Sequence, residues 1–181
     1  MESVEVIAFL GCALLALAGA FKMKDPAPTV GAMRALHLPA SLMSVRLMGF
    51  VEVVIGLVAA LTGSAIAMGL VGIAYVAFVL IVLAAMNAKT QIQSCGCFGK
   101  TDTPPSLVHL GANSVFAVVA LASAFKGTET LPEMLANQPM FALPFLVTFA
   151  VALYLVVLGL TVLPSSRRPQ LVASVGRQRH L

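Results

Sequence analysis

Five apolar stretches, each about as long as a lipid bilayer is thick, take up most of this 181-residue sequence. Glu5 and Glu52 are the only acidic residues inside them. A helix needs about 20 apolar residues to cross the hydrocarbon core, and a backbone in lipid must satisfy its own hydrogen bonds. The sequence therefore predicts an all-α integral membrane protein, a bundle of five transmembrane helices at residues 4–21, 45–61, 65–88, 106–125 and 141–163.

The composition argues against a water-soluble domain. Only 10% of the residues are charged, whereas a soluble domain carries roughly 25%. The net charge of +4 comes from basic residues that flank the apolar stretches, where they meet anionic lipid headgroups. We therefore expect membrane lipids as partners and no nucleic acid.

The distribution of Lys and Arg predicts the orientation in the membrane. With five spans, ten of the 11 basic residues fall on one face, and Lys126 alone falls on the other. Basic loops stay in the cytoplasm. The first stretch begins "MESVEV", which has no basic residue and is unlike a signal peptide, so we expect a retained helix. These features predict a bacterial inner-membrane protein with its N-terminus outside and its C-terminus and the loop of residues 89–105 in the cytoplasm.

The segments between the apolar stretches are short. We therefore predict a single domain, the helical bundle, over residues 1–163. In the first loop, "DPAP" predicts an extended turn, because Pro disfavours helix in the residue before it. The following "TVGAMRALHL" predicts a short helix on the membrane surface, ended by Pro39; the alternative is a disordered loop. Residues 164–181 form a basic tail that suits topological anchoring.

Two cysteines lie one glycine apart in the polar loop "SCGCFGK" at residues 94–100. A disulfide between Cys95 and Cys97 requires a tight bend, which Gly96 tolerates. Lys100 adds a positive charge that favours the thiolate. A C-x-C pair has too few ligands for a tetrahedral metal site, and we expect no metal or other cofactor. These features favour redox chemistry over the alternative of two incidental loop cysteines.

Glu52 is an acidic residue well inside the second span. At about 100° per residue, Arg46, Gly49, Glu52 and Gly56 share one stripe of that helix. Intramembrane carboxylates almost always face the bundle interior. Two interpretations stay open: a structural Glu that fixes helix packing, and a proton acceptor that serves thiol or quinone chemistry.

His109 lies about one turn inside the fourth span, close in the chain to both loop cysteines. Spacings of three and four place Ser106, His109 and Asn113 on one helix face. A histidine there is suited to accept or return a proton during disulfide exchange; the alternative is a satisfied interfacial histidine. Cys12, by contrast, is expected to act as a small buried hydrophobe.

The motif "CGCFG" before a membrane helix resembles the MauE branch of the DoxX-like membrane proteins. The stretches "AGAFKMKDP" and "RLMGFVEVVIG" also resemble that family, and the likeness covers about residues 8–125. It implies a four-helix DoxX-like core, here followed by a C-terminal helix, and thiol–disulfide chemistry alongside a thioredoxin-like partner. The family often has Arg-Asn after the cysteine loop, whereas this chain has Ala112–Asn113.

The residues and the resemblance together predict a membrane thiol–disulfide redox protein. We expect it to exchange electrons with a thioredoxin-like or membrane partner in the maturation of another redox protein. The predicted site residues are Cys95, Cys97, His109 and Glu52. The alternatives are a non-catalytic membrane subunit or assembly factor, and a quinone-linked oxidoreductase subunit of the DoxX type.

Overall fold

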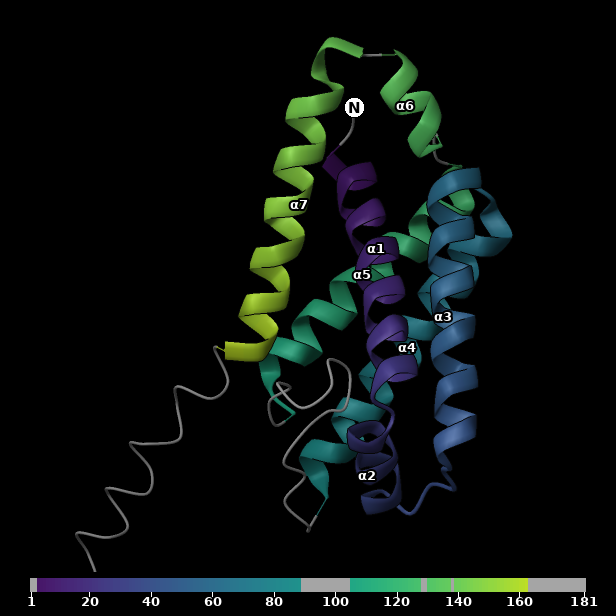
Figure 1. The fold of residues 1–181 in the computed structure, drawn as a ribbon, viewed down its shortest axis with the longest axis vertical. Coiled ribbons are helices and arrows are strands. Elements are labelled where there is room, and N and C mark those ends of the chain that lie inside the picture. Colours follow the sequence, from purple (N-terminus) through teal and green to yellow (C-terminus); the bar gives the residue numbers. More distant parts are fainter. Residues whose placement is uncertain (1–2, 89–104, 128–129, 138, 163–181) are drawn as a thin grey trace, which may run out of the picture.

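The computed structural model describes residues 3–88, 105–127, 130–137 and 139–162, and this part of the chain is helical. Five helices are long and apolar enough to cross a membrane, which confirms the predicted fold class (Figure 1). They are α1, α3, α4, α5 and α7, and α2 and α6 are shorter. The bounds are α1 Ser3–Lys24, α2 Ala27–Ala35, α3 Leu42–Thr62, α4 Ala65–Asn87, α5 Leu107–Lys126, α6 Leu131–Asn137 and α7 Pro139–Val162.

The bundle consists of two closely packed helix pairs and one peripheral helix. Helix α1 packs along α3, and α4 packs along α5. Contacts of α3 with α4 and of α1 with α5 join the two pairs. Helix α7 runs along the outside of the bundle beside α1 (Figure 1). The core lies where α1, α4 and α5 meet, around Leu15, Tyr75 and Phe116.

Glycines bring the backbones of α1 and α3 into direct contact. A Cβ atom on Gly49 would lie 2.5 Å from the carbonyl oxygen of Gly19, and one on Gly56 would lie 2.6 Å from that of Cys12. Small residues allow such close approach between membrane helices. Gly49, Glu52 and Gly56 are all buried, so the predicted interior face of this span is confirmed for these three residues.

A second set of contacts fixes α4. The hydroxyl of Tyr75 donates a hydrogen bond of 2.7 Å to the carbonyl oxygen of Gly11, which ties α4 to α1. Gly72 lies against α5, and a Cβ atom there would come within 2.6 Å of the Leu121 side chain. Gly72 therefore allows α4 and α5 to approach closely.

The first loop differs from its prediction. Helix α2 begins at Ala27 and includes Pro28, where an extended turn was expected. The physical reason is that a proline in the first helical turn loses no hydrogen bond, because the N–H there has no partner in the helix. The helix also ends at Ala35, before Pro39 is reached. The predicted short helix is thus present, but it is shifted toward the N-terminus.

The segment before the last span also contains more helix than expected. Helix α6 forms within residues 126–140, and α7 begins at Pro139 instead of residue 141. A reciprocal capping box precedes α6: the Thr130 N–H donates to Glu133 Oε2 at 3.0 Å, and the Glu133 N–H donates to Thr130 Oγ1 at 3.2 Å. These hydrogen bonds lower the pKa of Glu133. The predicted tail, residues 164–181, lies outside the described residues.

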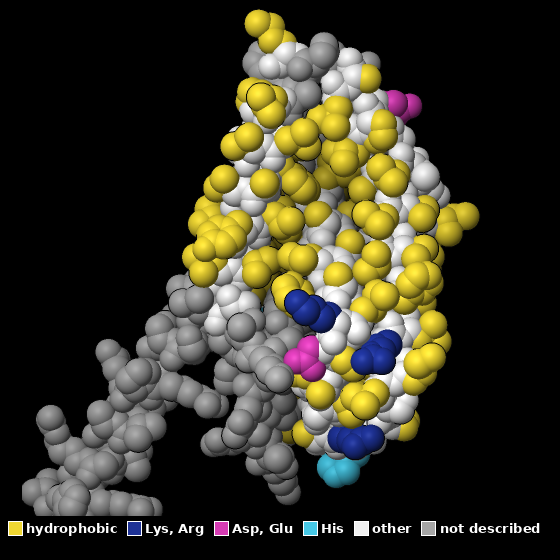
Figure 2. Space-filling model, viewed as in Figure 1, with side chains coloured by type: hydrophobic (Ala, Val, Ile, Leu, Met, Phe, Trp, Pro, Cys, Tyr) yellow, Lys and Arg dark blue, Asp and Glu magenta, His cyan; other side chains and the backbone are white. Residues whose placement is uncertain are grey.

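Basic side chains gather at the end of the bundle where α2 lies (Figure 2). The chain passes back and forth five times, so α1 ends, α3 begins, α4 ends and α5 begins at this same end (Figure 1). Among the described residues, Lys126 is at the opposite end, where α5 terminates. The separation of charge along the bundle thus follows the predicted alternation of spans.

Candidate functional site

The cysteine loop joins α4 to α5 at the basic end of the bundle. Cys95 and Cys97 lie in residues 89–104, outside the described residues, so their disulfide stays a prediction. The helices on either side are described: α4 ends at Asn87 and α5 begins at Leu107. These two helices pack against each other.

His109 is held in the first turn of α5, with its ring in the bundle. The side chain is buried, at 3% exposed. Its Nδ1 lies 2.9 Å from the Oγ of Ser106, the extended residue that caps the helix. The predicted face of Ser106, His109 and Asn113 is therefore present, and Ser106 fixes the imidazole of His109 in position.

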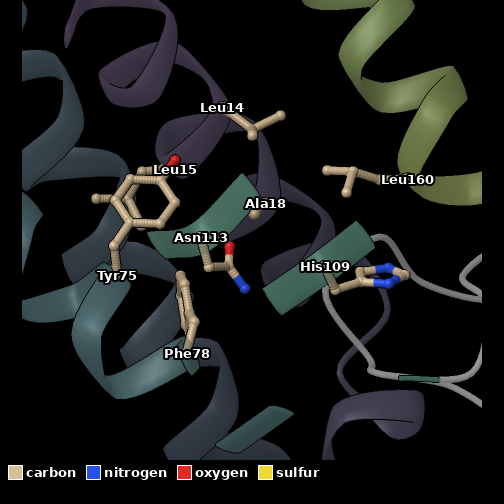
Figure 3. A pocket seen from close by; sticks show the side chains of 8 residues that line it. All are labelled: Leu14, Leu15, Ala18, Tyr75, Phe78, His109, Asn113 and Leu160. Carbon is tan, nitrogen blue, oxygen red and sulfur yellow. The ribbon is translucent and has the colours of Figure 1, made fainter. Parts of the chain in front are cut away.

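A small pocket lies beside His109, between α1, α4, α5 and α7 (Figure 3). Its volume is about 20 Å³. The polar residues among those that line it are His109, Asn113 and Tyr75, and the others are apolar. The lining residues are Leu14, Leu15, Ala18, Tyr75, Phe78, His109, Asn113 and Leu160.

Glu52 forms a buried ion pair with Lys22 of α1. The Nζ of Lys22 lies 2.6 Å from Glu52 Oε2, and the two residues are 2% and 5% exposed. Arg46, which the helix periodicity placed in the stripe of Glu52, is exposed instead. The interior face is centred on Val45, Gly49 and Glu52, and Arg46 lies one residue outside it.

The partner of Glu52 was missed because Lys22 follows directly on the first apolar stretch and resembles an interfacial flank. The sequence does contain a signal for this ion pair: a glycine and a charged residue have the same spacing in both helices. Gly19 and Lys22 are three residues apart on α1, as Gly49 and Glu52 are on α3. Because α1 and α3 run antiparallel, Gly19 and Gly49 face each other at the crossing, and the side chains of Lys22 and Glu52 extend toward each other from opposite sides of it. The Cβ that Gly49 lacks would lie 3.0 Å from the Lys22 side chain.

Phe78 of α4 connects this ion pair with the pocket. The Nζ of Lys22 lies 4.8 Å from the centroid of the Phe78 ring, within the range of a cation–π contact. The same ring lines the pocket together with His109 and Asn113 (Figure 3). Two of the predicted site residues, Glu52 and His109, are thus linked through Lys22, Phe78 and the pocket that Phe78 and His109 line.

Cys12 lies in the core and makes no disulfide. Its side chain is fully buried, and its Sγ lies 3.9 Å from the sulfur of Met68. This environment suits the small hydrophobe that the sequence predicted. Within the part of the chain that the structure describes, His, Cys, Asp and Glu side chains form no group of three or more that would hold a metal ion.

Comparison with known proteins adds one finding. A family model described as "Methylamine utilisation protein MauE" matches residues 2–126, which include helices α1 to α5 and the cysteine loop. No curated protein and no solved structure matches the chain. Helices α6 and α7 lie beyond the matched residues.

Proposed function

The chain belongs to the MauE family, and from this premise we propose that it is a membrane redox protein that exchanges electrons through Cys95 and Cys97. The observation that carries the proposal is the family match, because residues 2–126 include the Cys-Gly-Cys loop. The family description refers to methylamine utilisation. We propose a role in the maturation of another redox protein, with a thioredoxin-like protein as the exchange partner.

The proposed reaction has two steps. The thiolate of one loop cysteine attacks a disulfide of the partner, so that a mixed disulfide forms and one partner sulfur leaves as a thiolate. The second loop cysteine then attacks the mixed disulfide, forms the Cys95–Cys97 bond and releases the second partner thiolate. Two electrons pass from the loop to the partner, and two thiol protons are released. The reverse sequence transfers the electrons in the other direction.

We assign His109 the exchange of these protons. Two features support this role: the side chain lies in the first turn after the cysteine loop, and its Nδ1 is fixed by Ser106. Proton transfer requires a group that is held in place, and imidazole is the side chain that most often transfers protons in this way.

We assign Glu52 the role of a positioning residue that acts through Lys22. Its carboxylate is already engaged in the ion pair at 2.6 Å, so accepting a proton would leave Lys22 as an isolated charge in the bundle, which is costly. The pair holds α1 against α3 at the end of the bundle that carries the cysteine loop. The structural interpretation of this Glu is therefore favoured over the proton acceptor.

We advance the thiol–disulfide reaction over the quinone alternative, because the family match covers the Cys-Gly-Cys loop.

For sidedness we propose a cytoplasmic loop, which the ten-to-one distribution of basic residues supports. Exported redox enzymes form their disulfides outside the cytoplasm, which favours the opposite arrangement. Labelling of Cys95 or Cys97 in intact cells by an impermeant maleimide would reverse our assignment.

The exchange reaction is tested by trapping the mixed disulfide. If Cys95 attacks, Cys97→Ser should accumulate a covalent adduct that a reductant removes; if Cys97 attacks, Cys95→Ser should do so. Cys12→Ser keeps both loop cysteines and serves as the matched control, which should trap nothing. If neither loop variant traps a partner and both retain full activity in cells, the protein is a non-catalytic assembly factor instead.

A further inference from the structure

Ser106 occupies the N-cap position of α5, yet its hydroxyl makes no hydrogen bond to the helix backbone. The backbone is extended there, with φ −146° and ψ 166°, and its carbonyl oxygen accepts a hydrogen bond of 3.1 Å from the Leu110 N–H. At such a position a serine hydroxyl usually accepts a hydrogen bond from a backbone N–H of the first turn. The Ser106 hydroxyl makes no such bond, and its Oγ lies instead 2.9 Å from the Nδ1 of His109.

The start of α3 shows the usual arrangement on a similar backbone. Ser41 is also extended, with φ −124° and ψ 161°, and its Oγ accepts a hydrogen bond of 3.1 Å from the N–H of Ser44, three residues further along the chain. His109 holds that third position in α5, but there the hydroxyl bonds to the side chain instead of the backbone. In α5 the hydroxyl of the N-cap serine therefore serves the imidazole.

A hydroxyl suits a group whose protonation changes. It donates one hydrogen and also accepts, whereas the Nδ1 of histidine accepts in one neutral tautomer and donates in the other and in the imidazolium. Ser106 can therefore keep its hydrogen bond to Nδ1 in all three forms of the ring. A backbone N–H or carbonyl oxygen in the same place could serve only one of the two roles. The ring points away from Asn113, its neighbour on this face of α5 (Figure 3).

We propose that Ser106 is a positioning residue for the proton exchange assigned to His109, because its hydroxyl holds Nδ1 both before and after the ring gains a proton. This role rests on the proposed function. When a loop thiol is deprotonated, its S–H bond breaks and an N–H bond forms on the neutral imidazole. The imidazolium then gives this proton to a departing partner thiolate. Ser106 loses no atom in either step, and its hydroxyl accepts from Nδ1–H whenever that nitrogen carries a proton.

The contact with His109 can be measured without the exchange reaction, because the chain contains only three histidines. After ¹⁵N-histidine labelling and reconstitution into lipid bilayers, the NMR shifts of the ring nitrogens report which nitrogen carries a proton. Ser106→Ala should move the Nδ1 signal of His109, which is identified by its loss in His109→Gln. The matched control is Ser64→Ala, since Ser64 is the N-cap of α4 and also forms no side-chain cap; it should not move this signal. An unmoved signal in Ser106→Ala would overturn the proposal.

The effect on the reaction is measured with oxidised glutathione as the disulfide, by the rate at which Cys95 and Cys97 become resistant to alkylation. In Ser106→Ala this rate should fall about tenfold, which is part of the roughly 10²–10⁴-fold that acid–base catalysis contributes. Ser106→Thr keeps a hydroxyl and should restore most of the rate, and Ser64→Ala should leave it unchanged. Adding Ser106→Ala to His109→Gln should slow the reaction no further, because Ser106 acts through His109.

Two failures are distinguishable in this experiment. If the wild-type loop is not oxidised at all, the exchange function is wrong and the role of Ser106 falls with it. If the wild-type loop is oxidised and Ser106→Ala reacts at the same rate, or if Ser106→Ala slows His109→Gln further, the positioning role alone is overturned.

Discussion

Helices α1 and α7 are both apolar enough to cross a membrane, yet they are packed very differently. Half of the residues in the apolar window of α1 are buried inside the bundle, compared with 6% for α7. What distinguishes α1 is its small and polar residues, Gly19 against α3 and Lys22 against Glu52. Since lipid is as apolar as leucine, apolar character alone does not hold membrane helices together. Close backbone approach and buried polar contacts do so here.

The largest effect is expected when one half of the ion pair is removed. Lys22→Met leaves the Glu52 carboxylate without its partner inside the bundle, and losses of about 3–5 kcal/mol are typical when a buried pair is broken. The double variant Lys22→Met with Glu52→Met removes both charges and should recover most of the stability. The free energy of unfolding in one fixed detergent measures both.

The exposed Arg46 at the same end of the bundle supplies the control. Arg46→Met should change the free energy of unfolding by no more than about 0.5 kcal/mol, as surface substitutions usually do. If the double variant is as unstable as Lys22→Met, then Lys22 and Glu52 do not stabilise the fold by pairing with each other.

A smaller loss is expected when the glycine contact is disturbed. Gly49→Ala introduces a Cβ atom 2.5 Å from the carbonyl oxygen of Gly19, so the helices must separate. We expect the free energy of unfolding to fall by about 1–3 kcal/mol, which is the usual cost of overpacking. The matched control is Gly111→Ala, where a Cβ would meet nothing within 4 Å. Alanine there should stabilise α5 by up to about 1 kcal/mol, and equal losses at the two glycines would rule out the proposed contact.

The direct comparison of α1 with α7 uses one leucine from each helix. Leu15 is 1% exposed and Leu155 is 57% exposed. Leu15→Ala should leave a cavity and cost about 1–3 kcal/mol, somewhat below the range for water-soluble cores because lipid also solvates leucine well. Leu155→Ala should change the free energy of unfolding by less than about 0.5 kcal/mol. Similar losses for both would mean that α7 is integrated into the core.

The features of this fold that depend on local rules were predictable from the sequence. Each span is recognisable because its length and apolar character are properties of one segment. Glu52 was placed in the interior because a carboxylate is too costly in lipid, and Ser106 was placed near His109 because the two are three residues apart. The start of α2 differs from its prediction because a proline such as Pro28 is tolerated in the first helical turn.

The features that depend on how helices meet were not predictable in the same way. Lys22 lies just past the apolar stretch, and only the crossing of α1 with α3 turns it toward Glu52. The peripheral position of α7 was also hidden, because an apolar residue such as Leu155 suits lipid and protein surroundings equally. Cys95 and Cys97 lie outside the described residues, so the sequence and the family are what support their chemistry.

A redox titration tests that chemistry most directly. The protein in detergent is equilibrated over a series of thiol–disulfide buffers, quenched with an alkylating reagent and weighed by mass spectrometry. We predict that Cys95 and Cys97 stop being alkylated together as the buffer becomes more oxidising, in one two-electron transition. For such a transition the equilibrium constant changes tenfold for each ~30 mV. The alkylation of Cys12 should not change. If both loop thiols remain alkylated at every potential, or are lost independently, the account of this protein as a thiol–disulfide exchanger is wrong.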